Sequence, residues 1–382
     1  MSHQATPSNN RRGFLTGRAL REEIERAGDR IADEIVGTEA ELAEPSARET
    51  IRLSTRAMAC EFSAIMNPGP ANQVMFASDA LDMVHALEAQ MTAYRDDSEL
   101  SELNQRAAAE PVTVEPGLFQ LLLQTRALYE ETQGAFDATS GPLIALWRRC
   151  RDAGRLPTQT EIDECRGRTG MNHLTFDEQH FSVRFQTQGV ELNLGGIGKG
   201  YALDRAGEFL TEQQVENWLF HGGRSSILAR GCHAAHAGWP VGIMNPLFTN
   251  RRLATVLLCD QAMSTSGSNI QYFRHGGRRY GHILDPRTGW PAEPLLSATA
   301  FAPTAAEADA LSTAFFVNGV EKTTRYCDNH SGIGAILIPQ PRGGRRIEPI
   351  VCQVPKDRLF FTRNAEMDVC VPDGMSGNDT QG

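Results

Sequence analysis

The stretch that decides the interpretation of this chain is Glu191-Leu-Asn-Leu-Gly195-Gly196-Ile197-Gly198-Lys199-Gly200-Tyr-Ala-Leu-Asp204. An apolar, strand-like approach leads into four glycines around one lysine, and a helix-like continuation follows. Glycine lets the backbone adopt left-handed dihedrals and approach a ligand closely, so successive N–H groups can point at one anion while Lys199 adds a positive charge. The stretch predicts either a phosphate-binding turn or an ordinary glycine-rich turn between a strand and a helix.

The spacing of the glycines excludes the two commonest phosphate motifs. A Walker A loop has Ser or Thr directly after the lysine to hold magnesium, and Gly200 occupies that place here. The dinucleotide fingerprint Gly-x-Gly-x-x-Gly also fails, because the glycines stand at 195, 196, 198 and 200. If a metal binds beside this turn, its side-chain ligands come from elsewhere in the chain.

Composition limits the class of partner. The 382 residues can bury a large core, as one large domain or two closely packed halves. The formal charge of −10 argues against sequence-independent binding to nucleic acid or to an anionic membrane, which needs clustered positive charge. No apolar segment is long enough to predict a membrane span. The eight cysteines include no Cys-x-x-Cys pair, which favours reduced thiols over a zinc site or a disulfide framework.

Residues 1–50 form a polar leader. Arg11-Arg12-Gly13-Phe14-Leu15 resembles a twin-arginine export signal, but a charged segment stands where the apolar part of such a signal belongs. Residues 18–36 have the periodicity of an amphipathic helix. The cytoplasm is favoured by the absent apolar part and the scattered cysteines, while the paired arginines leave export open.

The order of predicted elements indicates an α+β fold. Helices are expected over 74–90, 118–132, 201–214 and 305–317, and strands over 51–66, 181–185, 190–194, from 218 onward and over 333–338. Strands and helices alternate without regular βαβ units, which predicts mixed sheets with flanking helices, preceded by the N-terminal helical extension. We expect one domain over 51–356 and a loose tail over 357–382, where Gly, Asp and Ser accumulate.

Two loops carry candidate functional groups. Ala135-Phe136-Asp137 stands among turn residues, and alone it is read as a loop closed by an Asx or Ser/Thr turn. His282 precedes Asp285-Pro-Arg-Thr288-Gly289, a strong turn signal because proline presets φ and glycine accepts a positive φ. A lone histidine is usually structural, but one held beside such a turn can serve as a general base.

Asp309 and Thr313 are four residues apart in a predicted helix, so their oxygens project from one face. A carboxylate with a hydroxyl is a hard-oxygen pair suited to magnesium. The alternative is that both residues cap the start of the helix.

Taken together and in this order, these motifs resemble the FAD:protein FMN transferase family, from about Met58 to Gly319. The matching segments are Met58-Ala-Cys60, Met91 to Tyr94, Ser98 to Asn104, Ala135-Phe136-Asp137, Gly195 to Asp204, Gly222-Gly223, Trp239 to Pro246, Thr265-Ser266-Gly267, His282 to Gly289 and Asp309 to Thr313. Any one of these segments is a weak signal. Their common order along the chain is specific.

The resemblance implies an enzyme that binds FAD with Mg²⁺, cleaves the diphosphate and transfers FMN to a Ser or Thr hydroxyl of an acceptor flavoprotein, releasing AMP. It implies metal ligation by Asp309, Thr313 and the carbonyl of Gly198. The other implied roles are a diphosphate contact from Lys199, flavin and adenosine pockets lined by Met58, Tyr94, Ala135, Phe136 and Asp137, and a catalytic base, His282, beside the turn at Asp285 and Thr288.

The chain departs from the family pattern at three places. Met-Gly-Thr is usual where Met58-Ala59-Cys60 stands, alanine is usual at Gly198, and an acid is usual where Arg224 follows the paired glycines. Small side chains are kept at the first two places, so the departures bear on substrate or acceptor preference more than on fold. Two other functions stay open: an FAD hydrolase that uses water as the acceptor and yields FMN and AMP, and a non-catalytic FAD-binding protein.

Overall fold

The structure is a computed structural model that describes residues 50–234, 236–267, 272–341 and 346–362. The twin-arginine-like start, the helix predicted over 18–36 and the end of the predicted tail lie outside the described residues. Within the described ranges, no helix has the length and apolar character needed to cross a membrane.

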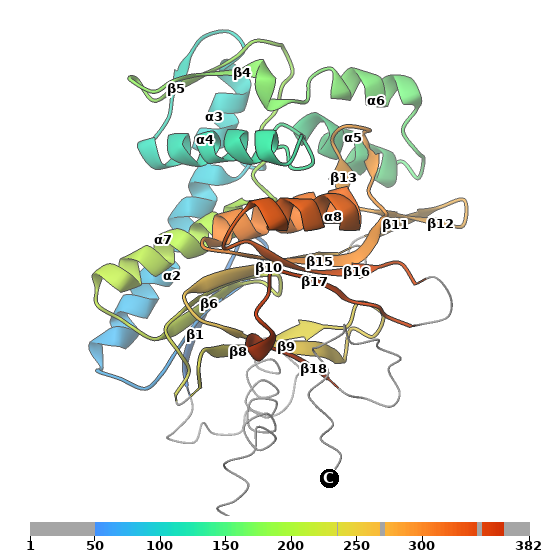
Figure 1. Ribbon diagram of the computed structural model, residues 1–382. Coiled ribbons are helices and arrows are strands. Elements are labelled where there is room, and N and C mark those ends of the chain that lie inside the picture. The colour runs from blue at the N-terminus through green and yellow to red at the C-terminus, as the bar shows by residue number, and fades with distance from the viewer. Residues whose placement is uncertain (1–49, 235, 268–271, 342–345, 363–382) are drawn as a thin grey trace, which may run out of the picture.

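The centre of the molecule is an antiparallel sheet of eight strands in the order β1-β2-β6-β7-β10-β15-β16-β17 (Figure 1). Its strands are β1 Ile51–Ala57, β2 Cys60–Met66, β6 Trp218–Gly222, β7 Ser226–Arg230, β10 Gln261–Gly267, β15 Leu295–Ala302, β16 Gly334–Pro339 and β17 Ile350–Cys352. All eight residues of β15 are buried, whichever face they point to. Such a strand needs a cover on both faces of the sheet, because alternate side chains point to opposite faces.

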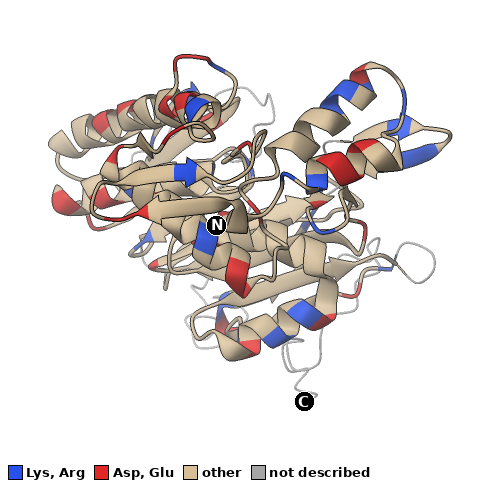
Figure 2. Cartoon of the chain, turned by 90° about the horizontal axis from the view of Figure 1, so that it is seen from above, with Lys and Arg blue, Asp and Glu red and all other residues tan. Residues whose placement is uncertain are grey.

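Three long helices cover one face: α2 Asn72–Met91, α7 Gly198–Glu212 and α8 Ala305–Asn329. Their inward sides join the sheet in the main hydrophobic core, to which Leu81, Leu203 and Phe316 contribute. Viewed from above, the acidic and basic positions lie mostly on outer helices and loops (Figure 2). Because α7 and α8 pack against each other, the glycine run of residues 195–200 lies close to the Asp309 segment.

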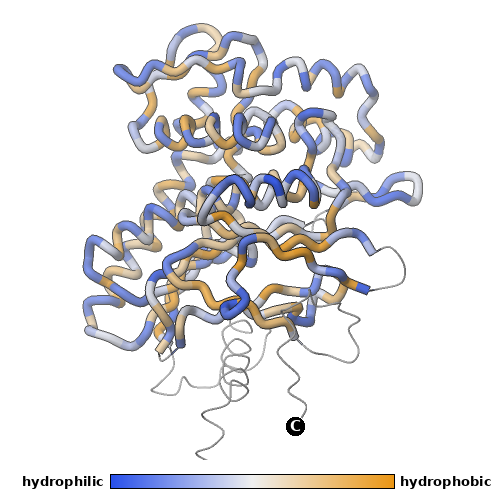
Figure 3. The backbone as a smooth tube through the Cα atoms, in the orientation of Figure 1, coloured by the Kyte–Doolittle hydropathy of each residue, from blue (hydrophilic) through white to orange (hydrophobic). Residues whose placement is uncertain are grey.

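A three-stranded sheet covers the other face, in the order β18-β9-β8, with strands β8 Trp239–Met244, β9 Arg252–Leu258 and β18 Leu359–Phe361. Trp239 and Leu253 pack there against Ile65 and Leu219 of the large sheet. Apolar segments are concentrated in these stacked strands (Figure 3). The domain is therefore layered as helices, large sheet and small sheet, in agreement with the predicted α+β class.

A smaller helical region lies beyond α8, opposite the sheets (Figure 1). Its elements are α3 Glu99–Arg106, β3 Val112–Thr113, α4 Pro116–Glu131, α5 Gly141–Asp152, α6 Gln159–Arg166, the 3₁₀ turn Met171–His173, β4 Leu174–Asp177 and β5 Ser182–Phe185. Two hairpins rise between this region and the sheet, formed by β11 Tyr272–His275 with β12 Arg278–Gly281 and by β13 Leu284–Asp285 with β14 Trp290–Pro291. A last 3₁₀ turn, Lys356–Arg358, precedes β18.

Three local predictions were wrong. The single strand expected over 51–66 is a hairpin, because Met58 and Ala59 adopt φ of 49° and 58° and form a tight turn of the kind that favours glycine. The strand expected over 190–194 is an extended segment with one isolated bridge, from Glu191 to Ser140. The helix expected over 305–317 continues to Asn329 across a kink at Gly319, where φ is 70°.

The predicted end of the domain at 356 was also wrong. Beyond it, Leu359 and Phe361 are almost fully buried, and β18 pairs with β9 through Leu359–Val256 and Phe361–Ala254. A short apolar run of three residues inside polar sequence is a weak strand signal, and its partner strand stands about a hundred residues earlier. The folded domain therefore includes part of the predicted tail.

Candidate functional site

The glycine run forms a compact turn that leads directly into α7. The side chain of Asn104 brackets the backbone of Leu192, accepting its N–H at 2.7 Å and donating to its carbonyl at 3.0 Å. Asn193 then closes an Asx turn, since its side-chain oxygen accepts the N–H of Gly195 at 2.9 Å. The helix begins at Gly198, so Lys199 and Gly200 lie in its first turn, where backbone N–H groups have no partner within the helix.

Lys199 forms an ion pair with Asp309, which comes from α8. Its ammonium lies 3.4 Å and 3.3 Å from the two carboxylate oxygens. The exposed fractions of the two side chains are 23% for Lys199 and 6% for Asp309. The glycine run and the Asp309 segment, 110 residues apart in sequence, therefore meet in one partly buried site.

Hydroxyl groups of the sheet complete the surroundings of Asp309. Ser226 of β7 and Ser264 of β10 each donate to Oδ1 of Asp309 at 3.0 Å. The N–H of Gly200 reaches Oδ2 at 3.3 Å. The carboxylate, carried by α8, is thus held by two strands and by α7, as expected of a buried charge that needs several hydrogen-bonding partners.

Thr313 lies one turn further along α8 and faces the same site. Its hydroxyl is 3.2 Å from the hydroxyl of Ser266, and a Cβ built on Gly196 would lie 3.8 Å from it and 3.3 Å from the ring of Phe136. Helix α8 is capped instead by Thr304, whose side chain accepts the N–H of Glu307. Asp309 and Thr313 therefore do not cap the helix, and the capping alternative is wrong.

Sequence reasoning missed two residues that build this site, Ser226 and Asp204. The carboxylate of Asp204, on α7, accepts the N–H groups of Ala305 and Ala306 at 2.7 and 2.8 Å and so fastens the start of α8 to α7. Burial raises the pKa of Asp204 to about 6. Neither role has a local signal, because the partners lie 83 to 102 residues away in sequence.

Gly200 is required by this contact between helices. A Cβ at this position would overlap the backbone of Ala305 and lie 2.6 Å from the nitrogen of Ala306. We expect Gly200→Ala to lower the free energy of unfolding by about 1–3 kcal/mol or more, because neither backbone can move aside without losing the Asp204 cap. Thermal or urea unfolding of the variant measures this loss.

Gly198→Ala is the matched control in the same helical turn. A Cβ there would meet only ordinary contacts, at 3.9 Å from Leu194 and Met91. Because alanine is the better helix former, this variant should be as stable as the unchanged protein or slightly more stable. Equal losses in the two variants would contradict the assignment of Gly200 to helix contact.

The Met58 turn and Tyr94 occupy different settings. The N–H of Met58 donates to the Glu88 carboxylate at 2.7 Å, which ties the turn to α2. Burial raises the pKa of the adjacent Cys60 thiol, and the nearby Lys199 ammonium opposes that rise, so the turn lies within electrostatic reach of the ion pair. Tyr94 is 67% exposed, and its ring lies under the Arg148 guanidinium at 4.7 Å.

Asp137 is buried at the floor of a polar pocket. Its Oδ1 accepts the N–H of Thr139 at 2.8 Å and the Thr139 hydroxyl at 2.5 Å, so the Asx turn predicted for this loop is present. Burial raises the pKa of Asp137 to about 6. Ala135 and Phe136 are buried beside it.

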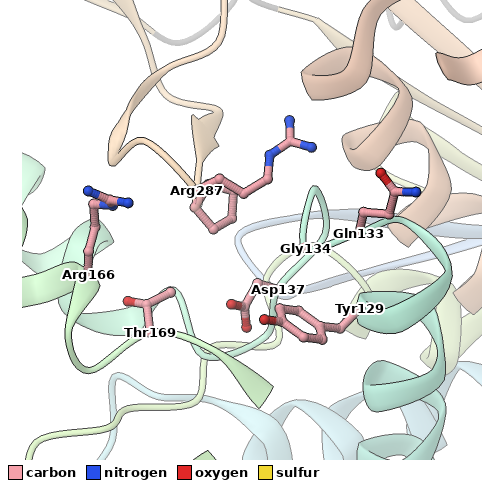
Figure 4. Close-up of a pocket in the computed structure, with 8 residues that line it drawn as sticks. Tyr129, Gln133, Gly134, Asp137, Arg166, Thr169 and Arg287 are labelled. Atoms are coloured by element: carbon pink, nitrogen blue, oxygen red, sulfur yellow. The ribbon is translucent and has the colours of Figure 1, made fainter. Parts of the chain in front are cut away.

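The pocket over Asp137 measures about 180 Å³, room for a polar group rather than for a whole dinucleotide. It is lined by Tyr129, Gln133, Gly134, Asp137, Arg166, Thr169, Pro286 and Arg287. In Figure 4, Asp137 and Tyr129 lie next to each other, with Arg166 and Arg287 on other sides of the opening. The pocket thus combines a buried carboxylate, whose ionised form destabilises the fold, with two cationic side chains. This combination is typical of binding sites.

Asp137→Asn should stabilise the protein at pH 7. A folded-state pKa near 6, raised above the ordinary value of 3.8, means that the folded state binds the proton more tightly. The unchanged protein should therefore gain stability as the pH falls from about 6 to about 4, and the carboxylate should cost about 1–3 kcal/mol at pH 7.

The asparagine variant keeps Oδ1 as an acceptor for Thr139 but carries no charge. Its free energy of unfolding at pH 7 should rise, and the change in stability on acidification should lose the part that Asp137 contributes. Urea titrations at pH 7 and pH 5 measure both quantities. Unfolding free energies that change with pH by the same amount in both proteins would contradict the assignment.

The turn predicted at Asp285 is present and is held by its own side chains. The carboxylate of Asp285 accepts the backbone N–H of Arg287 at 3.0 Å and binds its guanidinium at 2.8 and 3.0 Å. The Thr288 hydroxyl accepts the N–H of Trp290 at 3.2 Å. Gly289 has φ of 75°, as the turn requires, and its carbonyl accepts the indole N–H of Trp147. His282 stands exposed in the bend between β12 and β13.

The donor set fits a hard divalent cation. Asp309 contributes a carboxylate, and Thr313, Ser264 and Ser266 contribute hydroxyls around it. Among the residues that the structure describes, no group of three or more His, Cys, Asp or Glu side chains is placed to hold a metal. Oxygen donors with a single carboxylate suit Mg²⁺, which completes its coordination with water and substrate phosphate, rather than Zn²⁺.

Comparisons with known proteins find relatives over most of the chain. An FAD:protein FMN transferase of Klebsiella pneumoniae (strain 342) is 31% identical over 290 residues, which cover 74% of this chain and 89% of that protein. One of Treponema pallidum (strain Nichols) is 33% identical over 289 residues, 70% and 78% of the two chains.

Solved structures give the same result. Flavin transferase ApbE from Vibrio cholerae superposes with a TM-score of 0.70 at 27% identity, covering 80% of this chain and 98% of that one. The ApbE protein of Thermotoga maritima superposes with a TM-score of 0.70 at 29% identity, covering 76% and 94%. Residues 51–337 match the model of the ApbE family. The family predicted from the motifs is thereby confirmed, and this chain belongs to the ApbE family.

Proposed function

We propose that this protein is a magnesium-dependent FAD:protein FMN transferase, which moves FMN from FAD to a Ser or Thr hydroxyl of an acceptor flavoprotein and releases AMP. The observation that carries the proposal is the Lys199–Asp309 pair at 3.3 Å, set at the start of α7 and surrounded by hydroxyl groups. This arrangement puts a cation, the N-terminal end of a helix and hard-oxygen donors in one place, which suits a diphosphate with its metal.

In the proposed reaction, the acceptor oxygen attacks the phosphorus on the FMN side of the diphosphate. A new phosphoester bond forms, the bond between that phosphorus and the bridging oxygen breaks, and AMP leaves with the bridging oxygen. Negative charge grows on the departing phosphate. The proposed groups that stabilise this charge are the Lys199 ammonium and the positive end of the α7 dipole, since Lys199 lies in the first turn of that helix.

His282 is the proposed base that takes the proton of the acceptor hydroxyl. Histidine suits this task because it can accept and return a proton near neutral pH. The exposure of His282 in its bend lets an incoming protein substrate reach it. The turn that follows His282 is held by hydrogen bonds of Asp285 and Thr288, and we propose that it fixes the course of the segment that carries His282.

Asp309, Thr313 and the Gly198 carbonyl are the proposed metal ligands. Bound there, Mg²⁺ would supply positive charge to the diphosphate. Asp309 has a second task, because its contact with Lys199 positions the ammonium beside the same site. The remaining proposed contacts to FAD are Met58, Tyr94 and the loop Ala135-Phe136-Asp137, with the Asp137 pocket taking a polar group of the ligand.

One incubation tests the function. The protein is mixed with FAD, Mg²⁺ and an acceptor protein that carries a Ser/Thr flavinylation motif, and the products are separated under denaturing conditions. Flavin fluorescence that stays with the denatured acceptor, together with one AMP per flavin, supports transfer. Free FMN with unmodified acceptor would instead identify an FAD hydrolase, and intact FAD would identify a binding protein. A Ser/Thr→Ala acceptor is the control.

A further inference from the structure

The hairpin of β11 and β12 lies in the chain between two parts of the proposed site. Its first strand follows β10, whose Ser264 and Ser266 contact Asp309 and Thr313. Its second strand ends at Gly281, and His282 is the next residue. In Figure 1 the hairpin extends away from the layered body, past α5 and α8. We call residues 272–281 the arm.

The base of the arm is held firmly by an aromatic cluster. Phe273 and Tyr280 stack on each other at 5.3 Å and pack against Trp147 of α5 at 5.8 and 6.0 Å. The side chain of His275 is joined to the carbonyl of Gly154 by a hydrogen bond of 3.1 Å. The arm therefore presents its outer face in a fixed direction.

That outer face is strongly basic. Tyr272 is 42% exposed, and its ring lies 3.8 Å from the guanidinium carbon of Arg279 and 5.9 Å from that of Arg274. Arg274 and Arg279 are directly paired across the hairpin. Two like charges opposite each other are destabilising unless a partner of opposite charge is present, so placing both arginines at one exposed spot lowers the stability of the free protein.

The two arginines have no carboxylate to neutralise them within the described part of the chain. The third arginine of the arm differs, since Arg278 forms an ion pair with Glu293 at 2.9 Å. A basic surface is also unusual in a protein of formal charge −10. An exposed pair of arginines beside an aromatic ring is a surface that binds carboxylates, with the guanidinium groups as bidentate donors.

We propose that the arm binds an acidic segment of the acceptor protein, next to the hydroxyl that receives FMN. This inference rests on the proposed transfer function, because it names the partner of the same site. His282 stands three positions after Arg279 in the chain, about 10 Å along an extended strand. An acceptor whose hydroxyl reaches His282 must pass close to the arm, and acidic side chains near the target residue would meet Arg274 and Arg279 there.

The experiment measures binding separately from transfer. The probe is a fluorescein-labelled peptide of about 15 residues, with a central threonine and Asp or Glu on both sides, and the comparison peptide carries Asn or Gln instead. At low salt, fluorescence anisotropy should show about tenfold tighter binding of the acidic peptide to the unchanged protein. The preference should disappear near 1 M salt, where screening shortens to about 3 Å.

The arm variant is Arg274→Glu/Arg279→Glu, and the matched control is Lys322→Glu/Arg325→Glu on the exposed side of α8. Both pairs change the formal charge by the same amount. The arm variant should lose the preference for the acidic peptide, and the control should keep it. The affinity for FAD, measured by quenching of flavin fluorescence, should be unchanged in both. Arg274→Gln/Arg279→Gln serves if the glutamates unfold the hairpin.

Three outcomes would overturn the inference: equal binding of the two peptides by the unchanged protein, an equal loss of preference in the arm variant and the control, or a loss of FAD affinity in the arm variant alone. The last would assign the arm to the nucleotide. If the proposed transfer function is wrong, the incubation of the unchanged enzyme with FAD, Mg²⁺ and acceptor leaves the acceptor unmodified. That result is separate from the peptide-binding result, so failure of the function and failure of the arm inference can be distinguished.

Discussion

The His282→Ala variant should bind FAD as tightly as the unchanged protein and transfer FMN about 100 to 10,000 times more slowly, the usual cost of removing a general base. The side chain stands exposed in a bend and is not part of a hydrophobic core cluster, so its truncation should leave the fold intact. Initial rates of acceptor labelling, with FAD binding followed by fluorescence, measure the two effects separately.

His180→Ala is the control for this variant. His180 is also exposed, but it lies next to β4 in the outer helical region and is bonded to Asp177. Its replacement should leave the transfer rate unchanged. If His282→Ala turned over at the rate of the unchanged protein, the base would have to be another residue.

Asp309→Asn is expected to lower the transfer rate about 100-fold or more and to remove the response of FAD binding to Mg²⁺. The asparagine keeps the shape and one oxygen acceptor for Ser226 and Ser264, but it cannot pair with Lys199 or neutralise a divalent cation. Breaking one partner of a largely buried ion pair costs about 3–5 kcal/mol at most, and the 23% exposure of Lys199 reduces that cost.

The readouts for Asp309→Asn are the transfer rate at several Mg²⁺ concentrations and the midpoint of thermal unfolding. Thr313→Ser is the matched variant, because it keeps the hydroxyl beside Ser266 and should retain most of the activity. An Asp309→Asn protein that still binds FAD more tightly with Mg²⁺ than without it would show that the carboxylate is not a metal ligand.

Much of the helical framework was predictable from the sequence. The helices at 72–91, 116–131 and 198–212 have long periodic patterns or clear start signals, and the predicted ranges agree with them to within a few residues at most ends. The Met58–Ala59 turn was not predictable, because both residues adopt left-handed dihedrals without the glycine that usually marks such a turn. The pairing of β18 was missed because a three-residue strand depends on its partner for stability.

The candidate site divides in the same way. The residue types that suggest phosphate and metal chemistry, Lys199, Asp309 and Thr313, were recognisable from spacing together with the family resemblance. The contacts that hold them in place, from Ser226 and Asp204, became visible only in three dimensions. The sequence around Ser226 and Asp204 does not indicate these contacts, because hydrogen-bond partners that are distant in the chain leave no local pattern.

The sequence by itself determined the family, the α+β class and the residues of the glycine run, since each depends on residue type and order. Only the tertiary structure decided that Gly200 is demanded by the backbone of Ala305, and that Asp309 faces Lys199 rather than capping its own helix. The physical reason is that dihedral preferences and periodicity act over a few residues, whereas close packing and the pairing of a buried charge depend on segments that only folding brings together.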